Sequence, residues 1–476
     1  MWALEGRVLL TAITTLTALG FMLIGYDIGV LGGLIENESF KKSFNYPSAA
    51  LLGTIVAILE IGCFVGSLVT AAFGERLGRK ASTSIGATAM LVGTILQTAS
   101  QDCVTMIVSR TVSGIGLGII VGKNSTVPVL QAEFSPKATR GIFVCIQLTV
   151  LNLGTMLAYW VDFAFSKDES LGSGQWRIPI ALQLVLILPL LLLSLFVVPE
   201  SPRWLASHAR TEEAKHVLRM LYTAPPTSDE PPEADMIFNA IIDTVNYDKQ
   251  FGSEHWGDVL RLLKYDDPIK SRRRLLIACG IQAFQQLGGI NCNFLFSRIG
   301  FSPSQSNLLS GGLFTWFFIA SFIPWFLIDT VGRRRLLLTC LPLMSAVLFA
   351  QAGFVSQVNK DGDFVAGVAA SVMVFLFMGL FTIGFQAVVW VYPSEILPLR
   401  FRAKGSALST AANWICNYLV VQMTPLAILT IKFRTYIIFG VINAVFVPIV
   451  YFTFPETKGM SLEEINELFS TTALVE

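Results

Sequence analysis

Long apolar runs recur along this whole 476-residue chain, and they restrict its fold more than any other feature. A helix of roughly 20 apolar residues crosses about 30 Å of hydrocarbon, where only helices and closed barrels satisfy their own backbone polar groups. Charged residues make up only 14% of the chain, against roughly a quarter in soluble domains. We therefore expect an all-α, multi-pass membrane protein. The twelve predicted spans cover residues 8–30, 49–73, 81–99, 104–129, 141–164, 178–198, 275–297, 306–328, 336–358, 364–392, 403–428 and 434–454.

One long polar stretch, residues 199–273, divides these spans into two sets of six. It contains a Pro-rich segment and, at Thr211-Glu212-Glu213, a typical helix start. We therefore predict a six-helix bundle over 1–198, a cytoplasmic helical linker over 199–273, a second six-helix bundle over 274–454, and a cytoplasmic tail over 455–476. The first apolar run is too long for a signal peptide and is expected to be the first span.

Basic residues predict the orientation of the chain in the membrane. With both ends of the chain in the cytoplasm, four short inner loops carry eleven Lys and Arg residues, against eight in the six outer loops. This bias has the sign of the positive-inside rule. Asn37-Glu38-Ser39 is then a glycosylation sequon in the first outer loop, which makes Asn37 a candidate for modification in a glycoprotein.

Acidic and basic motifs repeat between the two halves. Glu75-Arg76-Leu77-Gly78-Arg79 corresponds to Asp329-Thr330-Val331-Gly332-Arg333 at an offset of 254, and Pro199-Glu200 corresponds to Pro455-Glu456 at 256. Glu133 and Arg140 likewise match Glu395 and Arg402 at 262. Such a repeat is typical of transporters built from two parallel halves.

The repeated motifs lie at cytoplasmic helix ends, where carboxylates and arginines can pair across the halves when the inner side is closed. Such a network can bias two states that differ by a few kcal/mol. The alternative, that the basic residues only anchor loops, leaves the matched acids unexplained. The predicted cytoplasmic gate consists of Glu75, Arg76, Arg79, Glu133, Arg140, Glu200, Asp329, Arg333, Arg334, Glu395 and Arg402.

Further motifs follow in order along nearly the whole chain. They are Gly74 to Lys80, Pro128 to Glu133 with Arg140-Gly141, Trp176-Arg177, Pro199 to Trp204, Gln285 to Asn291, and Pro455 to Gly459. Together they resemble the sugar porter family of the major facilitator superfamily, in its fungal branch. The resemblance implies two pseudo-symmetric six-helix bundles, transport of a small sugar-like solute by alternating access, and no cofactor.

An acidic residue inside the first span predicts the ion-coupling site. Intramembrane charges are costly to bury unpaired, and Arg110 in the fourth span lies at a depth similar to that of Asp27. Arginine keeps its charge, so Asp27 is the member that titrates. In the resembled family, proton-coupled members have Asp here and facilitators often have Asn, which favours H⁺ symport over a purely structural ion pair. Glu60 and Lys123 also lie in spans, and for each of them a structural bond is the favoured interpretation.

Amide and indole side chains at mid-span predict the substrate site, because a sugar offers hydroxyl groups and an apolar ring face. Asn413 and Trp414 share one span, and the resemblance places Gln147, Gln285, Gln286, Asn291, Trp390 and Asn413 on sugar-contacting positions. Amides that only join helices are the alternative for any single one. Some positions depart from the pattern of the resembled family, among them Phe317, Leu295-Phe296 and Phe385-Gln386-Ala387. The solute therefore stays open between a monosaccharide, a polyol, a sugar acid and a non-sugar metabolite.

Several function classes are disfavoured. Seven cysteines without metal-type spacing indicate neither a metal site nor a disulfide framework, and no nucleophile or metal cluster indicates an enzyme. The net charge of +1 disfavours a nucleic-acid partner. We expect a functional monomer in the plasma membrane whose partners are the solute, protons and lipid. The remaining alternatives are a facilitative uniporter, an exporter and a nutrient receptor.

Overall fold

The computed structural model describes residues 5–34, 37–121, 140–222, 233–250, 266–267, 269–292, 301, 303–361, 363–398, 402–460, 464–465 and 468–469. Every regular element in these ranges is a helix, as the apolar runs predicted. Ten helical segments among the described residues are long and apolar enough to cross a membrane. The other two predicted spans correspond to a helix over residues 79–99 that is rich in Ser, Thr and Gly, and to one over 271–287 that has only 17 described residues.

The first bundle contains the helices that correspond to the first six predicted spans. Its sixth span is interrupted at Leu182 and Gln183, between Pro179 and Pro189, because proline lacks the N–H that a helix interior uses. The helices are α1 (Gly6–Leu34), α3 (Ala49–Leu77), α4 (Arg79–Ala99), α5 (Cys103–Val121), α7 (Arg140–Ser166), α8 (Gly174–Ala181), α9 (Leu184–Leu192) and the π-helical turn η3 (Leu193–Val197).

The second bundle repeats this arrangement. Its fourth span contains a π-helical turn, η6 (Thr382–Gln386), and extends to Ile396, four residues beyond the predicted end. The other elements are α14 (Ser271–Leu287), η4 (Ile290–Cys292), α15 (Pro303–Ala320), α16 (Pro324–Leu327), α17 (Arg333–Asp361), α18 (Phe364–Phe381), α19 (Ala387–Ile396), α20 (Arg402–Thr430) and α21 (Arg434–Thr453).

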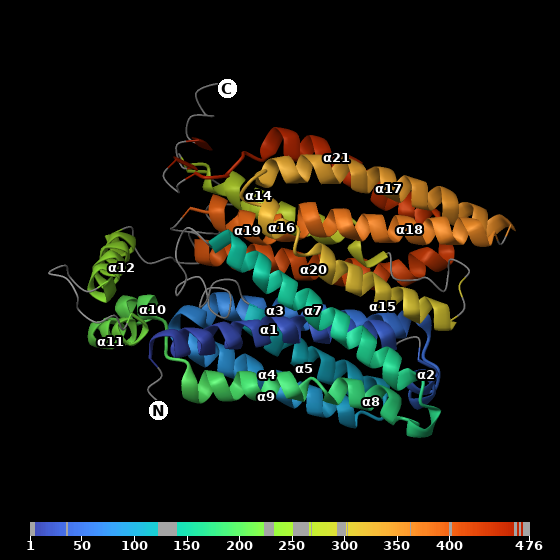
Figure 1. Cartoon of the computed structure of the whole chain (residues 1–476), viewed down its shortest axis with the longest axis horizontal. Helices are drawn as coiled ribbons and strands as arrows, with labels where there is room; N and C mark the ends of the chain where they lie inside the picture. The colour runs from blue at the N-terminus through green and yellow to red at the C-terminus, as the bar shows by residue number, and fades with distance from the viewer. Residues whose placement is uncertain are drawn as a thin grey trace.

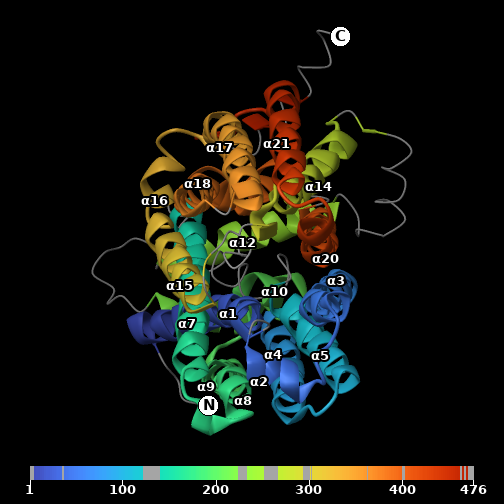
Figure 2. The ribbon, with the colours of Figure 1, turned by 90° about the vertical axis from the view of Figure 1, so that its right-hand side faces the viewer.

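The two bundles lie side by side along their length (Figures 1 and 2). Within the first bundle α3 packs on α5 and α1 packs on α7, and within the second α17 packs on α21 and α14 on α20. Helices α3 and α20 meet across the boundary between the bundles, as do α7 and α15. The two pairs form opposite sides of the interface (Figure 2).

Short helices mark the two ends of the bundles. The linker helices α10 (Pro202–Ser207), α11 (Thr211–Leu221) and α12 (Glu233–Gln250) lie beyond one end, which we call the linker face. Helix α1 begins and α21 ends at this same face (Figure 1). The short helix α2 (Glu38–Ser43) lies at the opposite face, and Asn37 caps it by accepting the backbone N–H groups of Ser39 and Phe40.

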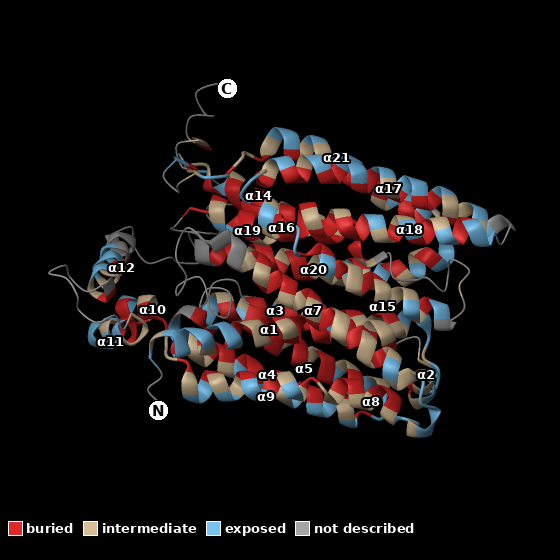
Figure 3. Cartoon of the chain, in the orientation of Figure 1, coloured by how far each residue is buried: buried red, intermediate tan, exposed pale blue. Residues whose placement is uncertain are grey.

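Burial is greatest where the bundles meet (Figure 3). Buried residues concentrate on the facing sides of α1, α3, α7, α19 and α20, whereas the outer sides of α9, α17 and α21 are exposed or intermediate. Many exposed side chains on these outer sides are apolar, such as Leu192 on α9 and Phe452 on α21. This inverted surface is what a chain that crosses hydrocarbon requires.

Candidate functional site

An ion pair is buried inside the first bundle, where the sequence predicted one. The Nη1 atom of Arg110 on α5 lies 3.3 Å from Oδ1 of Asp27 on α1, and the two side chains are 1% and 0% exposed. Each residue is seven positions from its helix end at the α2 side, which is about 10 Å of helix rise. The predicted pairing at equal depth is therefore present in the geometry.

A third residue, which sequence reasoning missed, completes this pair. Gln183 donates from Nε2 to Asp27 Oδ1 over 3.1 Å, and its own Oε1 accepts from Thr94 on α4. The helix interruption at Leu182 and Gln183 orients this amide inward. A glutamine between two prolines in a Leu-rich span was the available signal. Asp27 Oδ2 and Arg110 Nε have no hydrogen-bond partner among the described residues, so the pair keeps unused hydrogen-bonding capacity.

Glycines bring α3 and α5 together beside this pair. A Cβ atom added at Gly62 would lie 2.5 Å from the carbonyl oxygen of Thr111, and one added at Gly114 would lie 2.3 Å from that of Leu59. Real Cβ atoms do not approach backbone so closely, so only glycine allows this helix separation. Close packing carries Glu60 on α3 into electrostatic range of both Arg110 and Asp27.

The predicted substrate amides of the second bundle bond to one another. Asn413 on α20 donates from Nδ2 to Gln285 Oε1 over 2.7 Å and to Gln282 Oε1 over 2.9 Å. Gln286 donates from Nε2 to Asn413 Oδ1 over 3.2 Å. Asn291 donates from Nδ2 to Gln286 Oε1 over 3.4 Å and to Asn417 Oδ1 over 2.6 Å. We call Gln282, Gln285, Gln286, Asn291, Asn413 and Asn417 the amide network.

The predicted aromatic residues lie at the boundary between the bundles. Trp414 on α20 is 4% exposed and packs into the apolar core of the first bundle, and half-buried Trp390 on α19 contacts the same core. The indole N–H of Trp414 has no acceptor among the described residues. Gln147 on α7 is also buried, and its amide has no partner in the part of the chain that the structure describes. Both groups are thus available to a ligand.

An amide pair joins the bundles at a place that sequence reasoning did not assign. Asn152 on α7 donates to Gln386 Oε1 over 3.1 Å, and Gln386 donates to Asn152 Oδ1 over 3.0 Å. Gln386 ends the π-helical turn η6, which directs it toward α7. One turn away, Trp325 Nε1 donates to Thr149 Oγ1, which donates to the carbonyl oxygen of Ser321. Gln386 was noted in the sequence as a departure, but its partner was not identified.

The repeated acidic motifs form two equivalent helix caps at the linker face. Glu200 accepts backbone N–H groups of Arg79 and Lys80 at the start of α4. Glu456 accepts those of Arg333 and Arg334 at the start of α17. Each cap is preceded by a glycine with positive φ, Gly78 at +84° and Gly332 at +101°. Carboxylates at helix N-termini are favourable, which gives the duplicated sequences a physical reason.

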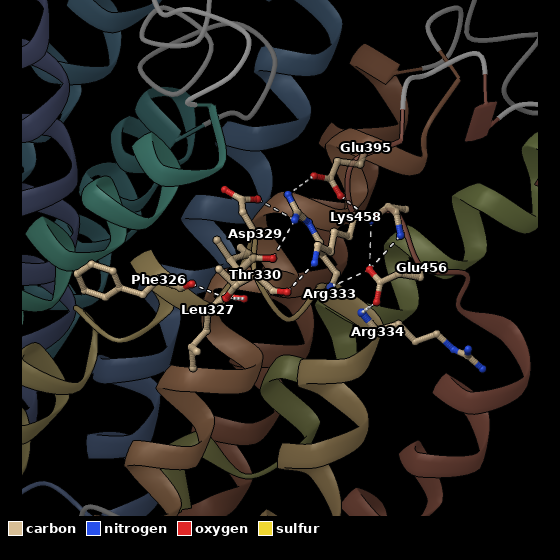
Figure 4. A network of polar contacts seen from close by, with 11 residues as sticks. Phe326, Leu327, Asp329, Thr330, Arg333, Arg334, Glu395, Glu456 and Lys458 are labelled. Carbon is tan, nitrogen blue, oxygen red and sulfur yellow. Dashed lines mark hydrogen bonds and ion pairs between the residues drawn. The ribbon is translucent and has the colours of Figure 1, made fainter.

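The described ion pairs of the predicted gate lie within one bundle (Figure 4). Arg333 contacts Asp329 and Glu395, each over 2.8 Å, and Glu395 also accepts from Thr457. No ion pair between described gate residues joins the two halves in this conformation. The sequence predicted such pairs for the state in which the inner side is closed, and they stay a prediction. Arg76 is exposed. Glu133 and the side chains of Glu75, Arg140 and Arg402 lie outside the described residues.

A groove of about 380 Å³ lies between α14 and α21 near the linker face. Arg272, Arg273 and Phe284 are among its lining residues, and none of the predicted substrate residues is. The amide network instead closes on itself in this conformation. A solute that bound at this network would have to replace amide–amide hydrogen bonds with its own hydroxyl groups, which can both donate and accept.

Comparison with known proteins gives consistent matches over the full chain. A family profile described as "Sugar (and other) transporter" matches residues 13–469. The chain is 34% identical to Sugar transporter STL1 of Saccharomyces cerevisiae, over 98% of this chain and 83% of that one. It is 35% identical to MFS-type transporter oryC of Aspergillus oryzae, covering 100% and 88%, and 31% identical to a high-affinity glucose transporter of Kluyveromyces lactis, covering 94% and 83%.

A solved structure shares the fold. The proton:xylose symporter XylE bound to 6-bromo-6-deoxy-D-glucose superposes with a TM-score of 0.79, at 24% identity, over 97% of this chain and 99% of that one. The inward open conformation of XylE from E. coli gives 0.73 at 23% identity, over 96% and 99%. These likenesses establish the arrangement of two six-helix bundles.

Proposed function

This chain belongs to the sugar porter family of the major facilitator superfamily, in its fungal branch, and on that premise we propose that it is an H⁺ symporter of a monosaccharide or a related polyol or sugar acid. It is a multi-pass membrane transporter and not an enzyme. Relatives named as a sugar transporter and a glucose transporter support a solute of this class. The proposal consists of two statements: that transport is coupled to protons, and that the solute belongs to this class.

The Asp27–Arg110 pair is the observation that carries the proposal. Both side chains are almost fully buried inside spans, where an uncompensated charge is costly. Arg110 keeps its charge, so proton uptake by Asp27 removes the anion that holds it. Gln183 and Thr94 connect Asp27 to α4 and to the start of α9. A change in the protonation of Asp27 therefore acts on contacts among four spans of the first bundle.

The amide network supports a polyhydroxylated solute. It offers several donors and acceptors within the bundle core, and Trp390 and Trp414 add flat apolar surfaces at its edge. Gln147 on α7 supplies a buried amide from the opposite bundle. A solute held between Gln147 on one side and Gln285, Gln286, Asn291 and Asn413 on the other contacts both bundles at once.

The contacts between the bundles support alternating access. Those formed by α7 with α15, α16 and η6 include a few specific hydrogen bonds, among them the Asn152–Gln386 pair, and the stacked rings of Tyr159 and Phe314 at 4.0 Å. A rocking motion of one rigid bundle against the other exchanges such contacts without unfolding either core. The caps at Glu200 and Glu456 stay within their own bundles during this motion, so we assign them to bundle integrity.

Uptake of radiolabelled hexoses, pentoses, polyols and sugar acids, in a host that lacks its own transporters and at two external pH values, tests the proposal. We expect one of these classes to accumulate above its external concentration, more strongly at the lower pH. Asp27→Asn should abolish this accumulation and retain exchange of labelled for unlabelled solute. Glu213→Gln is the control, because this carboxyl is exposed on the linker and pairs only with Arg210 among the described residues.

The outcomes separate the two proposed parts. Equilibration without accumulation at either pH identifies a facilitative uniporter and refutes coupling. Transport of none of the four solute classes refutes the substrate assignment.

We also propose a functional monomer in the plasma membrane with Asn37 glycosylated. A fluorescent fusion, the molecular mass of the detergent-solubilised protein, and a glycosidase mobility shift that Asn37→Gln abolishes test these three points.

A further inference from the structure

A second buried carboxyl group lies between the ion pair and the amide network. Glu60 is on α3, eleven residues from Ala49, and is 5% exposed. Its Oε2 atom has no hydrogen-bond partner among the described residues. An intramembrane carboxyl with unused capacity indicates a functional role more often than a structural one. Glu60 takes no part in the gate contacts or the helix caps described above.

Polar groups from three other helices surround Glu60. Arg110 on α5, Asp27 on α1 and Asn417 on α20 all lie within electrostatic range of its carboxyl. On α3 itself, Cys63 lies one turn away. Lys123 is outside the described residues. Since α20 belongs to the other bundle, Glu60 connects the ion pair of one bundle to the amides of the other. Helices α3 and α20 are adjacent in Figure 2.

The Asn417 amide links this carboxyl to the predicted substrate site. Asn417 Oδ1 accepts from Asn291 over 2.6 Å, and Asn291 also donates to Gln286. An acidic group at one end of a hydrogen-bonded chain polarises every member of it. A solute hydroxyl that takes the Asn291 amide thus changes the polarisation of the Asn417 amide beside Glu60. Substrate occupancy and the charge of Glu60 are connected through two amides.

Charge balance determines how many protons this cluster holds. Two ionised carboxylates and one guanidinium have a net charge of −1, whereas one proton shared by the two carboxyls makes the cluster neutral. Because burial disfavours net charge, the cluster that is closed off from water takes up one proton. Two carboxyls that compete for one cation titrate as a pair. Proton transfer between them breaks one O–H bond and forms another, and Arg110 moves its ion pair to whichever carboxylate is ionised.

We propose that Glu60 and Asp27 share this proton around Arg110, and that Asn417 couples the position of the proton to substrate binding at the amide network. Glu60 is then a second proton-coupling residue. The proposal rests on the proposed function, since it specifies how that symport is coupled. It differs from a coupling site of Asp27 and Arg110 alone, in which Glu60 has only a structural bond.

Glu60→Gln is the decisive change, because it removes the charge and keeps the side-chain volume. Asp27 and Arg110 then sum to zero without a proton, so proton uptake is no longer required. We expect solute-dependent proton uptake at background level, equilibration instead of accumulation, and retained exchange. We expect the wild-type KM for solute to fall when the external pH falls from about 7.5 to about 5.5, and the KM values of Glu60→Gln at these two pH values to differ less than twofold. Glu213→Gln, which changes an exposed carboxyl of the linker paired with Arg210, is the control and should behave like the wild type.

Asn417→Leu provides an independent second variant, because it cuts the connection and leaves both carboxyls. It should retain proton binding but lose most of the pH dependence of KM. Wild-type accumulation and proton uptake in Glu60→Gln refute the inference and leave the proposed symport intact. If Glu60→Gln does not reach the membrane, a wild-type pH response of KM in Asn417→Leu refutes it. Absence of solute-dependent proton uptake in the wild type refutes the proposed symport and the inference together.

Discussion

Replacement of Gln286 with leucine tests the amide network at its centre. Gln286 has two hydrogen bonds in this conformation, to Asn413 over 3.2 Å and from Asn291 over 3.4 Å. Both are longer than the usual 2.9–3.0 Å, roughly, for N–H···O bonds, so exchanging them for solute hydroxyls costs little. The wild type therefore gains nearly the full value of a new hydrogen bond when solute binds, whereas the leucine variant cannot form it.

The magnitude follows from that bond. Losing one buried hydrogen bond to the solute costs about 1–3 kcal/mol, and each 1.4 kcal/mol, roughly, is a factor of ten in affinity. We expect Gln286→Leu to raise KM by about tenfold to a hundredfold. The maximal exchange rate should stay within about twofold, because losing an interaction made equally in the bound state and the transition state changes KM alone.

The assay is exchange of labelled for unlabelled solute at a series of concentrations, at one pH and without a gradient, so that proton coupling does not enter. Gln351→Leu on α17 is the matched control. Gln351 is a fully buried amide of the same bundle, and neither of its amide atoms has a hydrogen-bond partner among the described residues. Its replacement should leave KM unchanged. Equal KM values for Gln286→Leu and the wild type would remove Gln286 from the solute site.

Two predictions concern stability, measured as the melting temperature of the solubilised protein. Gly114→Ala should lower it by an amount that corresponds to about 1–3 kcal/mol, because the added Cβ meets backbone on α3. Gly353→Ala is the control: nothing lies within 4 Å of its added Cβ and alanine is the better helix former, so the melting temperature should stay the same or rise slightly. A fall as large as that of Gly114→Ala would refute the close-packing argument. Glu456→Gln should cost about 1 kcal/mol, because a charged cap at the start of α17 becomes neutral. Glu213→Gln removes an exposed ion pair and should change stability by less than about 0.5 kcal/mol; a larger effect there than at Glu456 would contradict the assignment of the cap.

Much of the fold follows from the sequence because the bilayer restricts the chain so strongly. Hydrocarbon excludes unpaired backbone, so each apolar run had to become a helix, and the structure has helices at all twelve predicted places. The duplicated Gly78/Glu200 and Gly332/Glu456 motifs could be found because each consists of short, locally readable sequences. Their function as helix caps was not predicted, because the two members of each cap are more than a hundred residues apart.

The site was predictable only in part. The Asp27–Arg110 pair and most members of the amide network could be identified, because polar residues inside spans are rare and have to find partners. Gln183 was missed, because a break in a helix directs it inward. Arg333 pairs in this conformation with Asp329 on its own segment and with Glu395, and pairing across the halves, predicted for the state in which the inner side is closed, stays a prediction.

Hydropathy determines which segments cross the membrane, since each segment partitions into the bilayer according to its own apolar content. It says nothing of which polar side chains meet between segments, because that depends on how closely and at what rotation the helices pack. Three local features determine how these helices pack: the glycines at the α3–α5 contact, the interruption before α9, and the π-helical turn before α19. Only the tertiary structure could therefore bring Glu60 beside Asp27, Arg110 and Asn417, and join Asn152 to Gln386 across the two bundles.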